Sequence, residues 1–230
     1  MKKNNRIWIY SLAVIGLLFF LTNSCTKKED DKVETVVDYD GNIYHVVTIH
    51  SQDWLVENLK VTHYRNGDPI SPVSGNAQWE DRTTGAYCDY DNLPANGTTY
   101  GRLYNWYAVN DSRKIAPTGW HVASDDEWTV LTNYLGGEDI AGGKLKEKGT
   151  THWKSPNSGA TNETGFTALP GGGRTFDGTF DYIIWGGQFW TSTSLNVDDA
   201  WIRYLDYNTT DVYRWVDGKT YGRSVRCVRD

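Results

Sequence analysis

Histidine, cysteine and serine are the residues of this sequence best suited to catalysis or metal binding, but their spacing matches no established catalytic pattern. The chain has five histidines, yet it has no His-Glu-x-x-His motif, no Cys-x-x-Cys pair and no two histidines at positions i and i+4. It also lacks the Gly-x-Ser-x-Gly turn that carries the nucleophile of many hydrolases. We therefore expect no catalytic residue and no transition-metal site.

Two clusters of oxygen-bearing side chains could bind a harder cation. Asp198 and Asp199 precede an expected strand, and Asp89, Asp91 and Asn92 lie together in a turn-rich segment. Carboxylate and amide oxygens are the ligands that calcium prefers, although the ligand spacing of an EF-hand loop is absent. An ordinary solvated loop is the alternative for both clusters. No cofactor is expected, and a structural calcium ion is left open.

The first 24 residues have the layout of a secretory signal peptide. Lys2, Lys3 and Arg6 give a basic start, and Ile7 to Leu21 is a run without charge. About 15 helical residues, at ~1.5 Å each, extend roughly 22 Å, which is short of a hydrocarbon core of ~30 Å. The segment is thus predicted to be an export signal and not a permanent membrane helix.

Cys25 follows this signal and is the candidate for lipidation. Its surroundings resemble a bacterial lipobox, with Ser24 in the fitting position and Thr22 where the pattern prefers Leu. Residues 26–31, Thr-Lys-Lys-Glu-Asp-Asp, resemble the tag that exports lipoproteins of the Bacteroidetes to the cell surface. A diacylated Cys25 predicts a lipid anchor in the outer membrane, with the domain at the cell surface. The alternative is an ordinary cleaved signal followed by a solvated linker.

The rest of the chain is acidic and is predicted to contain one domain. Residues 25–36 are charged and aperiodic, so we expect a flexible tether there and a domain over residues 37–230. The first 24 residues hold three of the 23 basic residues and none of the 29 acidic ones, so the remainder has a formal net charge of −9. Such a charge repels phosphate backbones and argues against a nucleic-acid partner.

Two cysteines remain after lipidation, and aromatic residues are unusually frequent. Cys88 and Cys227 could form one disulfide in an oxidising compartment, and two buried free thiols are the alternative. The chain has 11 Trp and 15 Tyr among 23 glycines, which predicts a loop-rich domain whose core is built from rings. Two or three of these rings are expected to be exposed for binding.

One helix is well specified, immediately after Ser124. Residues 124–127 form a capping box, in which the Ser124 hydroxyl accepts from the Glu127 amide and the Glu127 carboxylate reaches back. Trp128, Leu131 and Leu135 then share one helical face, which should be buried. Two weaker helices are expected, at residues 103–109 and 140–148.

Short strands separated by turn residues dominate the remainder. The segment Asn42 to Ile49 follows an Asp-Gly turn and is predicted to be a strand. The chain is expected to end in an antiparallel meander with strands at 200–205, 211–216 and 221–228. Residues 171–175, Gly-Gly-Gly-Arg-Thr, lack the Gly-Lys-Ser/Thr element of a phosphate-binding loop and are expected to form a tight loop.

Five segments, in order along the chain, resemble one domain family. They are Trp54 to Leu59, Tyr100 to Trp106, Pro117 to Val122, Gly165 to Gly172, and Ser224 to Val228. Together they resemble the Fibrobacter succinogenes major paralogous domain, which is common in surface proteins of Fibrobacteres and Bacteroidetes. The resemblance runs from about Val37 to Asp230, and Ala123 stands where the family usually has Pro.

This family in turn resembles the C-type-lectin-like fold of formylglycine-generating enzymes, whose helix start is similar to Val122 through Trp128. The resemblance implies an α+β domain with a small twisted antiparallel sheet, one or two helices and long irregular loops. It also implies that a strand at Tyr44 to Ile49 pairs with one at Ser224 to Val228.

The resemblance does not carry an activity. The formylglycine-generating enzymes need a copper-binding cysteine pair, and their iron-using relatives need a histidine cluster; neither set has a recognisable counterpart here. We expect a surface-tethered, non-catalytic module that binds a glycan or a surface protein in adhesion. The alternatives are a divergent oxidoreductase or carboxylate-dependent hydrolase, and a structural subunit of the envelope.

The resemblance also suggests where a ligand would bind, since lectin-like folds use long loops and an adjoining strand pair. Here this region maps to residues 176–185 and 196–199, beside the strand that carries Arg203. Aromatic rings could stack on a pyranose, while carboxylates and amides could bind its hydroxyls. The candidate ligand-binding residues are Tyr182, Trp185, Asp198, Asp199, Arg203 and Asn208.

Overall fold

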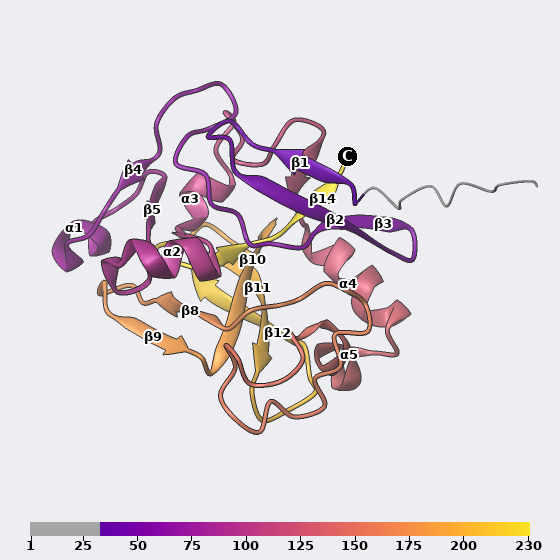
Figure 1. Cartoon of the computed structure of the whole chain (residues 1–230). Helices are drawn as coiled ribbons and strands as arrows, with labels where there is room; N and C mark the ends of the chain where they lie inside the picture. Colours follow the sequence, from indigo (N-terminus) through magenta and orange to yellow (C-terminus); the bar gives the residue numbers. More distant parts are fainter. Residues whose placement is uncertain (1–32) are drawn as a thin grey trace, which may run out of the picture. The chain divides into compact units, whose positions relative to one another are not determined.

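Three β-sheets and a few short helices form the part of the chain that the structure, a computed structural model, describes, namely residues 33–230 (Figure 1). The expected α+β class is confirmed. The expected single antiparallel sheet is wrong, because there are three sheets and two of them include parallel pairs. The predicted signal peptide, residues 1–24, and the predicted lipidation site, Cys25, lie outside the described residues.

The first sheet joins segments from both ends of the described chain. Its strands, in spatial order, are β1 (Thr35–Val37), β2 (Ile43–Ile49), β3 (Gln52–Leu55), β14 (Cys227–Arg229) and β7 (Trp120–Val122). All of its pairs are antiparallel. The strand predicted from Asn42 to Ile49 is confirmed as β2. Within residues 33–230, the first strand begins at Thr35, so the last two residues of the expected tether belong to β1.

The expected pairing of β2 with the chain end is wrong, although both segments are in this sheet. Ile49 ends β2 and Gln52 begins β3, so only two residues connect the strands. His50, in this turn, has a φ of 57°, the left-handed conformation that tight hairpins favour. The turn folds β3 onto β2, and β3 then occupies the place beside β14.

The second sheet has six strands and carries most of the site described below. Its strands are β12 (Tyr213–Gly218), β11 (Asp199–Asp206), β10 (Gly186–Ser194), β8 (Gly171–Arg174) and β9 (Phe180–Ile183), with β13 (Ser224–Val225) also paired to β10. The smaller third sheet contains β4 (Ser71–Pro72), β5 (Ala86–Cys88) and β6 (Leu103–Tyr104).

The predicted meander is confirmed for β11 and β12 but is wrong for the last strand. The segment expected as one strand divides into β13, which runs parallel to β10, and β14, which joins the first sheet. Arg226 lies between them and is 1% exposed. Its guanidinium donates to the side chain of Asn58 at 2.6 Å and to the backbone carbonyls of Leu55 and Phe166 at 2.8 and 2.9 Å. These bonds fix the crossing between the sheets.

The expected loop at residues 171–175 is also wrong, because Gly171–Arg174 forms the buried strand β8. Glycine suits this strand because its backbone lies close to neighbouring groups. A Cβ at Gly173 would lie 1.8 Å from Nη1 of Arg223, so no side chain fits there. Arg174, fully buried, donates from Nη1 to the carbonyl of Val73 at 2.6 Å.

The helices are short, and more numerous than the one or two that the family resemblance implied. They are α1 (Asn76–Glu80), the 3₁₀ turn η1 (Tyr90–Asn92), α2 (Pro94–Tyr100), α3 (Trp106–Val109), α4 (Asp125–Tyr134) and α5 (Glu138–Leu145). The helix expected at 103–109 is instead β6 followed by α3, because Asn105 caps the helix by accepting from the Ala108 amide at 3.1 Å. The helix expected at 140–148 is α5.

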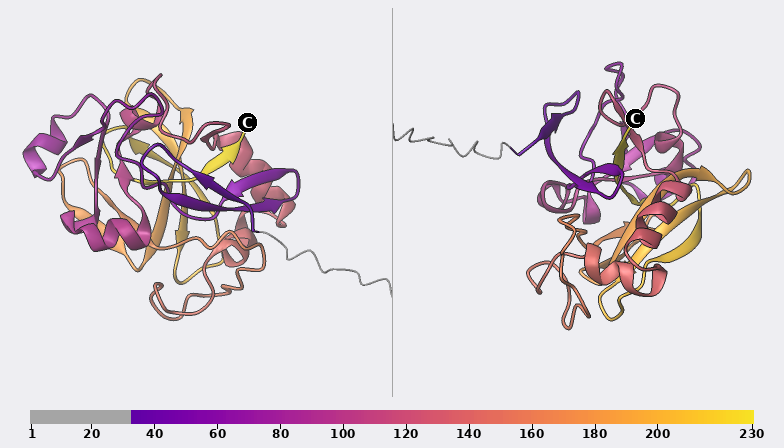
Figure 2. Two further views of the ribbon diagram at one scale, coloured as in Figure 1. Left: turned by 45° about the horizontal axis from the view of Figure 1, so that its top comes forward. Right: turned by 90° about the vertical axis from the view of Figure 1, so that its right-hand side faces the viewer.

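Helix α4 agrees with its prediction. Ser124 accepts from the Glu127 amide at 3.3 Å, and the Glu127 carboxylate accepts from the Ser124 amide at 2.7 Å, which completes the capping box. Trp128 is fully buried, with its ring centroid 5.1 Å from that of Trp54 and 5.5 Å from that of Phe189. Through this packing α4 covers one face of the second sheet (Figure 2).

The disulfide considered for Cys88 and Cys227 is not formed. Both thiols are free and buried, in separate clusters of the core. Cys88 lies in the third sheet, whereas Cys227 lies in the first sheet beside Val122. Burial raises the pKa of the Cys88 thiol to about 12 and raises the pKa of the Cys227 thiol further. The alternative of two buried free thiols therefore describes the structure.

Candidate ligand-binding site

A cavity of 460 Å³ opens over one face of the second sheet. Strands β11 and β12 supply every second residue to it, as the two-residue period of a strand requires. Tyr204 is paired with Tyr213 across the two strands, and Ile202 is paired with Trp215. The residues that β11 and β12 contribute are Ile202, Tyr204, Asp206, Tyr213, Trp215 and Asp217.

The intervening residues face the opposite way, which corrects the prediction for Arg203. Its side chain is fully buried beneath α4, and so it cannot be a surface ligand-binding group. Nη2 of Arg203 lies 2.7 Å from Oδ1 of Asp125, and Nη1 lies 2.9 Å from Oε1 of Glu138. Arg203 therefore ties the sheet to the first turns of α4 and α5.

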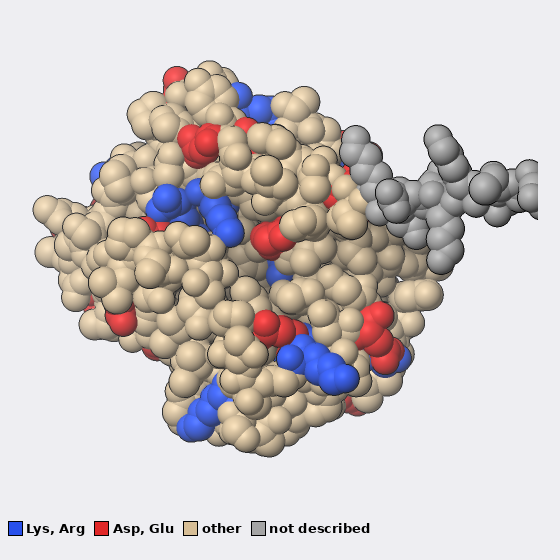
Figure 3. Space-filling model, viewed as in Figure 1, with Lys and Arg blue, Asp and Glu red and all other residues tan. Residues whose placement is uncertain are grey.

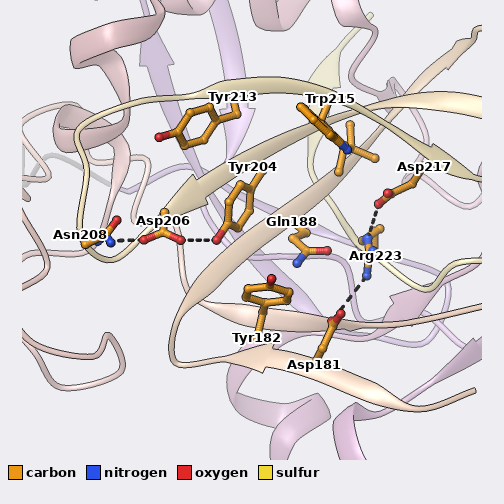
Figure 4. A pocket seen from close by; sticks show the side chains of 11 residues that line it. Asp181, Tyr182, Gln188, Tyr204, Asp206, Asn208, Tyr213, Trp215, Asp217 and Arg223 are labelled. Carbon is orange, nitrogen blue, oxygen red and sulfur yellow. Dashed lines mark hydrogen bonds and ion pairs between the residues drawn. The ribbon is translucent and has the colours of Figure 1, made fainter.

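Aromatic rings line the cavity from three strands. The close-up shows Tyr182 from β9 below the cavity, Tyr204 from β11 in the middle, and Tyr213 and Trp215 from β12 above (Figure 4). The Tyr204 and Tyr213 rings are stacked, with centroids 5.8 Å apart and planes 26° apart. Tyr182 meets Tyr204 edge-on at 6.1 Å. The side chains of Tyr182, Tyr213 and Trp215 are 52%, 37% and 65% exposed.

Gly186 makes room for this arrangement. It lies opposite Asp206 in the ladder between β10 and β11, and the Tyr204 ring passes directly over its backbone. A Cβ at Gly186 would lie 2.4 Å from Cε2 of Tyr204, closer than unbonded carbon atoms can approach. Any larger residue would move the Tyr204 ring.

Asp206 provides a carboxylate at one end of the cavity. It accepts a very short hydrogen bond from the Tyr204 hydroxyl and a 3.0 Å bond from the backbone N–H of Asn208. Burial, followed by the bond to Asp206, raises the pKa of Tyr204, so this hydroxyl stays protonated and remains a donor. The side chain of Asn208 lies beside Asp206 at the same end (Figure 4).

A buried arginine and two more carboxylates lie at the other end. Nε of Arg223 is 2.7 Å from Oδ2 of Asp217, and Nη1 is 3.9 Å from Oδ1 of Asp181. Burial raises the pKa of Asp181, although Arg223 acts in the opposite direction. Oδ1 of Asp181 and Oε1 of the neighbouring Gln188 are buried without a hydrogen-bond donor.

The other predicted site residues lie elsewhere. Trp185 is 40% exposed, and Nζ of Lys154 lies over its ring, 3.1 Å from the centroid. Asp198 lies in the loop before β11 and Asp199 begins that strand, and their backbone amides both donate to Oδ1 of Asn196 at 2.8 Å. Tyr182 and Asn208 are thus the two predicted residues that the cavity brings together.

The sequence analysis missed the larger part of the lining, including Tyr204, Tyr213 and Trp215. The usable signal was the alternation of rings with other residues along the two predicted strands of the meander. It did not reveal which alternating set faces outward.

Surface charge, metal ligands and helix hydrophobicity add three further observations. Acidic and basic side chains are interspersed on the face seen in Figure 3, without a large area of one sign. Among residues 33–230, no three His, Cys, Asp or Glu side chains converge in a group suited to a metal ion. Within the same residues, no helix combines the length and the apolar character needed to cross a bilayer.

Comparison with known proteins identifies a family. The family model of the Fibrobacter succinogenes major domain matches residues 47–229, which is most of the chain and includes the whole cavity. No curated protein and no solved structure matches the chain. On the strength of this match, the chain belongs to the Fibrobacter succinogenes major domain family.

Proposed function

We propose that this protein is a non-catalytic recognition module of the cell surface and that it binds a glycan in the cavity over β10, β11 and β12. The observation that carries the proposal is the row of exposed rings on one sheet face. Tyr182, Tyr213 and Trp215 keep large apolar surfaces in contact with water, although most other large rings of this domain are buried. Clustered rings of this kind, in a concave site with a few polar groups, are typical of ligand binding.

The chemistry of the lining suits a sugar. A pyranose has an apolar face of C–H groups, which packs on an aromatic ring, and a rim of hydroxyls, which needs hydrogen-bond partners. Trp215 and Tyr182 offer ring faces, while Asp206 and Asn208 offer an acceptor and a donor. The volume of 460 Å³ is in the usual range for a small-ligand site.

The C-type-lectin-like fold is part of this proposal. It is supported by the α+β class, by the capped helix α4 after β7, and by a first sheet that contains both β2 and β14. Superposition of this domain on the determined structure of a lectin-like domain tests the fold. The same elements in the same order would support it. A different strand order would contradict it.

The proposed location is the outer membrane, with the domain at the cell surface and a diacylated Cys25 as the anchor. Two acyl chains retain a protein stably where one is marginal, because each buried CH₂ contributes about 0.8 kcal/mol. Cells fed radiolabelled palmitate should label the wild type but not Cys25→Ala, which should be released or unprocessed. An unlabelled wild type would contradict the anchor.

The raised pKa of Asp181 favours a second candidate, hydrolysis of a glycosidic bond. A carboxyl group with a raised pKa could serve as the general acid, with a second carboxylate across the cavity as base or nucleophile. In this structure Asp217 is engaged by Arg223, and Asp206 by Tyr204 and Asn208. New reducing ends from oligosaccharides incubated with the protein, but not with Asp181→Asn, would establish this activity.

A glycan array probed with the purified full chain tests the main proposal. We expect binding that is lost in the double variant Tyr182→Ala/Trp215→Ala. Tyr134→Ala is the matched control, because that ring is 56% exposed but lies on α4. An array without any bound glycan, or a profile that the double variant leaves unchanged, would overturn the proposal. Capture of an envelope protein that depends on the same rings would instead indicate a protein ligand.

A further inference from the structure

We infer that the sugar unit that enters this cavity carries a protonated amine. The inference rests on the proposed function, because it names the chemical class of the ligand at the same site. Two features of the lining support it: an excess of carboxylates and tyrosine rings in two orientations.

The carboxylates outnumber the accessible positive charges. Asp181, Asp206 and Asp217 line the cavity, whereas Arg223 is its single cationic lining residue. Arg223 is 4% exposed and is engaged by Asp217 at 2.7 Å, so its charge is largely neutralised before a ligand arrives. With every group counted as ionised, the three carboxylates and one guanidinium give the lining a formal charge of −2, and a concave site focuses such a field.

Asp206 is the carboxylate best placed for a cation. Within residues 33–230 it makes no ion pair, and its partners are the Tyr204 hydroxyl and the Asn208 backbone N–H. Lys146 lies nearby, but its Nζ donates to the backbone carbonyl of Asp206, at 2.8 Å, and not to the carboxylate. The Asp206 carboxylate therefore retains capacity for an ammonium group of a ligand.

The tyrosines beside Asp206 reinforce the preference for positive charge. Tyr204 and Tyr213 are stacked, and the plane of Tyr182 is turned 69° from that of Tyr204. The face of an aromatic ring carries negative charge density, so a cation that contacts the exposed Tyr182 or Tyr213 ring would be attracted by that ring as well as by the carboxylate. A neutral hydroxyl or acetamido group gains much less from the ring faces.

An amine on a sugar fits the cavity better than an amine on a lysine side chain. Polar groups lie at both ends of the site, with Asp206 and Asn208 at one end and Asp181 and Asp217 at the other (Figure 4). A lysine side chain has one polar group, at its tip, and would leave the second end unmatched. An amino sugar has an amine and several hydroxyls around one ring.

Calorimetric titration of the full chain with two matched trisaccharides tests the inference. One is the glucosamine trimer, and the other is its fully N-acetylated counterpart, compared at about pH 6, where amines are protonated. We expect the amine form to bind at least about tenfold more tightly, and this advantage should shrink as salt is added.

Two isosteric variants test which carboxylates cause the preference for the amine trimer. Asp206→Asn and Asp181→Asn each remove one negative charge and should weaken binding of the amine trimer about tenfold, with the neutral trimer changed less than about twofold. Asp126→Asn is the control, because it makes the same charge change at an exposed position on α4 and should leave both affinities unaltered.

The outcomes separate this inference from the proposed function. Equal affinity for the two trimers would overturn the amine preference and leave a glycan-binding function in place. Failure of the protein to bind either trimer or any other glycan would overturn both. Binding of a lysine trimer as tightly as the glucosamine trimer would assign the site to a peptide and overturn the sugar class.

Discussion

One face of the second sheet is covered by α4 and the other face lines the cavity. Adjacent residues of the same strand point to opposite faces. In β11, Arg203 is fully buried in ion pairs under α4, while Tyr204 faces the cavity. In β10, Phe189 packs on Trp128, while Gln188 lies in the cavity lining with an unpartnered oxygen. The covered face is thus stabilised by packing and charge pairing. The cavity face keeps rings that add little to the core, so substitutions should separate stability from binding.

The largest expected effect is on the covered face. Trp128→Ala should lower the free energy of unfolding by about 3–5 kcal/mol, because it removes a fully buried ring in contact with Trp54 and Phe189. Urea unfolding measures it, and Trp128→Phe should lose clearly less. A loss below about 1 kcal/mol would mean that this face is not the packed one.

The next largest effect on stability is expected at the buried Lys146. Its Nζ donates to the backbone carbonyls of Ser158, Asp206 and Thr209 at 3.0, 2.8 and 2.7 Å, so it fixes the turn after β11. Burial lowers the pKa of Lys146 from 10.5 to about 8, although Asp206 and Asp211 act in the opposite direction. Between these two values the unfolded chain binds more protons than the folded one, so stability should rise with pH in this window.

The expected contribution is about 2 kcal/mol between pH 8 and pH 10. The thiols and tyrosines with raised pKa act in the opposite direction, above about pH 9 and pH 10 respectively, so the informative quantity is the difference between wild type and Lys146→Met. Across this range the stability of the wild type should rise relative to that of the variant. Parallel pH profiles would contradict a lowered pKa of Lys146.

A smaller effect is expected at the start of α4. Ser124→Ala should cost about 1 kcal/mol, because the Glu127 amide loses its side-chain acceptor at the helix N-terminus. Thermal unfolding checks this value, and Ser124→Asp should restore most of the loss, since an aspartate also caps a helix. If Ser124→Asp were as unstable as Ser124→Ala, capping would not be the reason.

The smallest effect on stability belongs to the cavity face. Trp215→Ala should change the free energy of unfolding by no more than about 0.5 kcal/mol, because the side chain is 65% exposed. The same variant should lose glycan binding. Its comparison with Trp128→Ala is the sharpest contrast between the faces, and a cost above about 2 kcal/mol would show that Trp215 is a packing residue.

Local signals predicted α4 well because its determinants are adjacent in sequence. Ser124 and Glu127 cap the helix, and the periodic Trp128, Leu131 and Leu135 define its buried face. The division of the last strand could not be predicted, because it depends on carbonyl acceptors for Arg226 that come from distant segments.

The site was only partly predictable for a related reason. The stretch Trp-Ile-Arg-Tyr-Leu-Asp in β11 places large apolar residues on both parities, so its pattern does not tell which face meets a helix. The buried partner of Arg203, Asp125, is 78 residues away. Without that contact, Arg203 was predicted to be a surface ligand-binding residue, whereas the structure buries it completely.

The most direct test follows the indole N–H signals of the protein by NMR while the glucosamine trimer is added, with each signal assigned from a Trp→Phe variant. The account predicts that the Trp215 signal shifts with ligand concentration, whereas the signal of Trp128, on the covered face, stays in place. A Trp215 signal that does not move while the ligand binds, or equal shifts of both signals, would contradict the claim that the cavity face is the binding face.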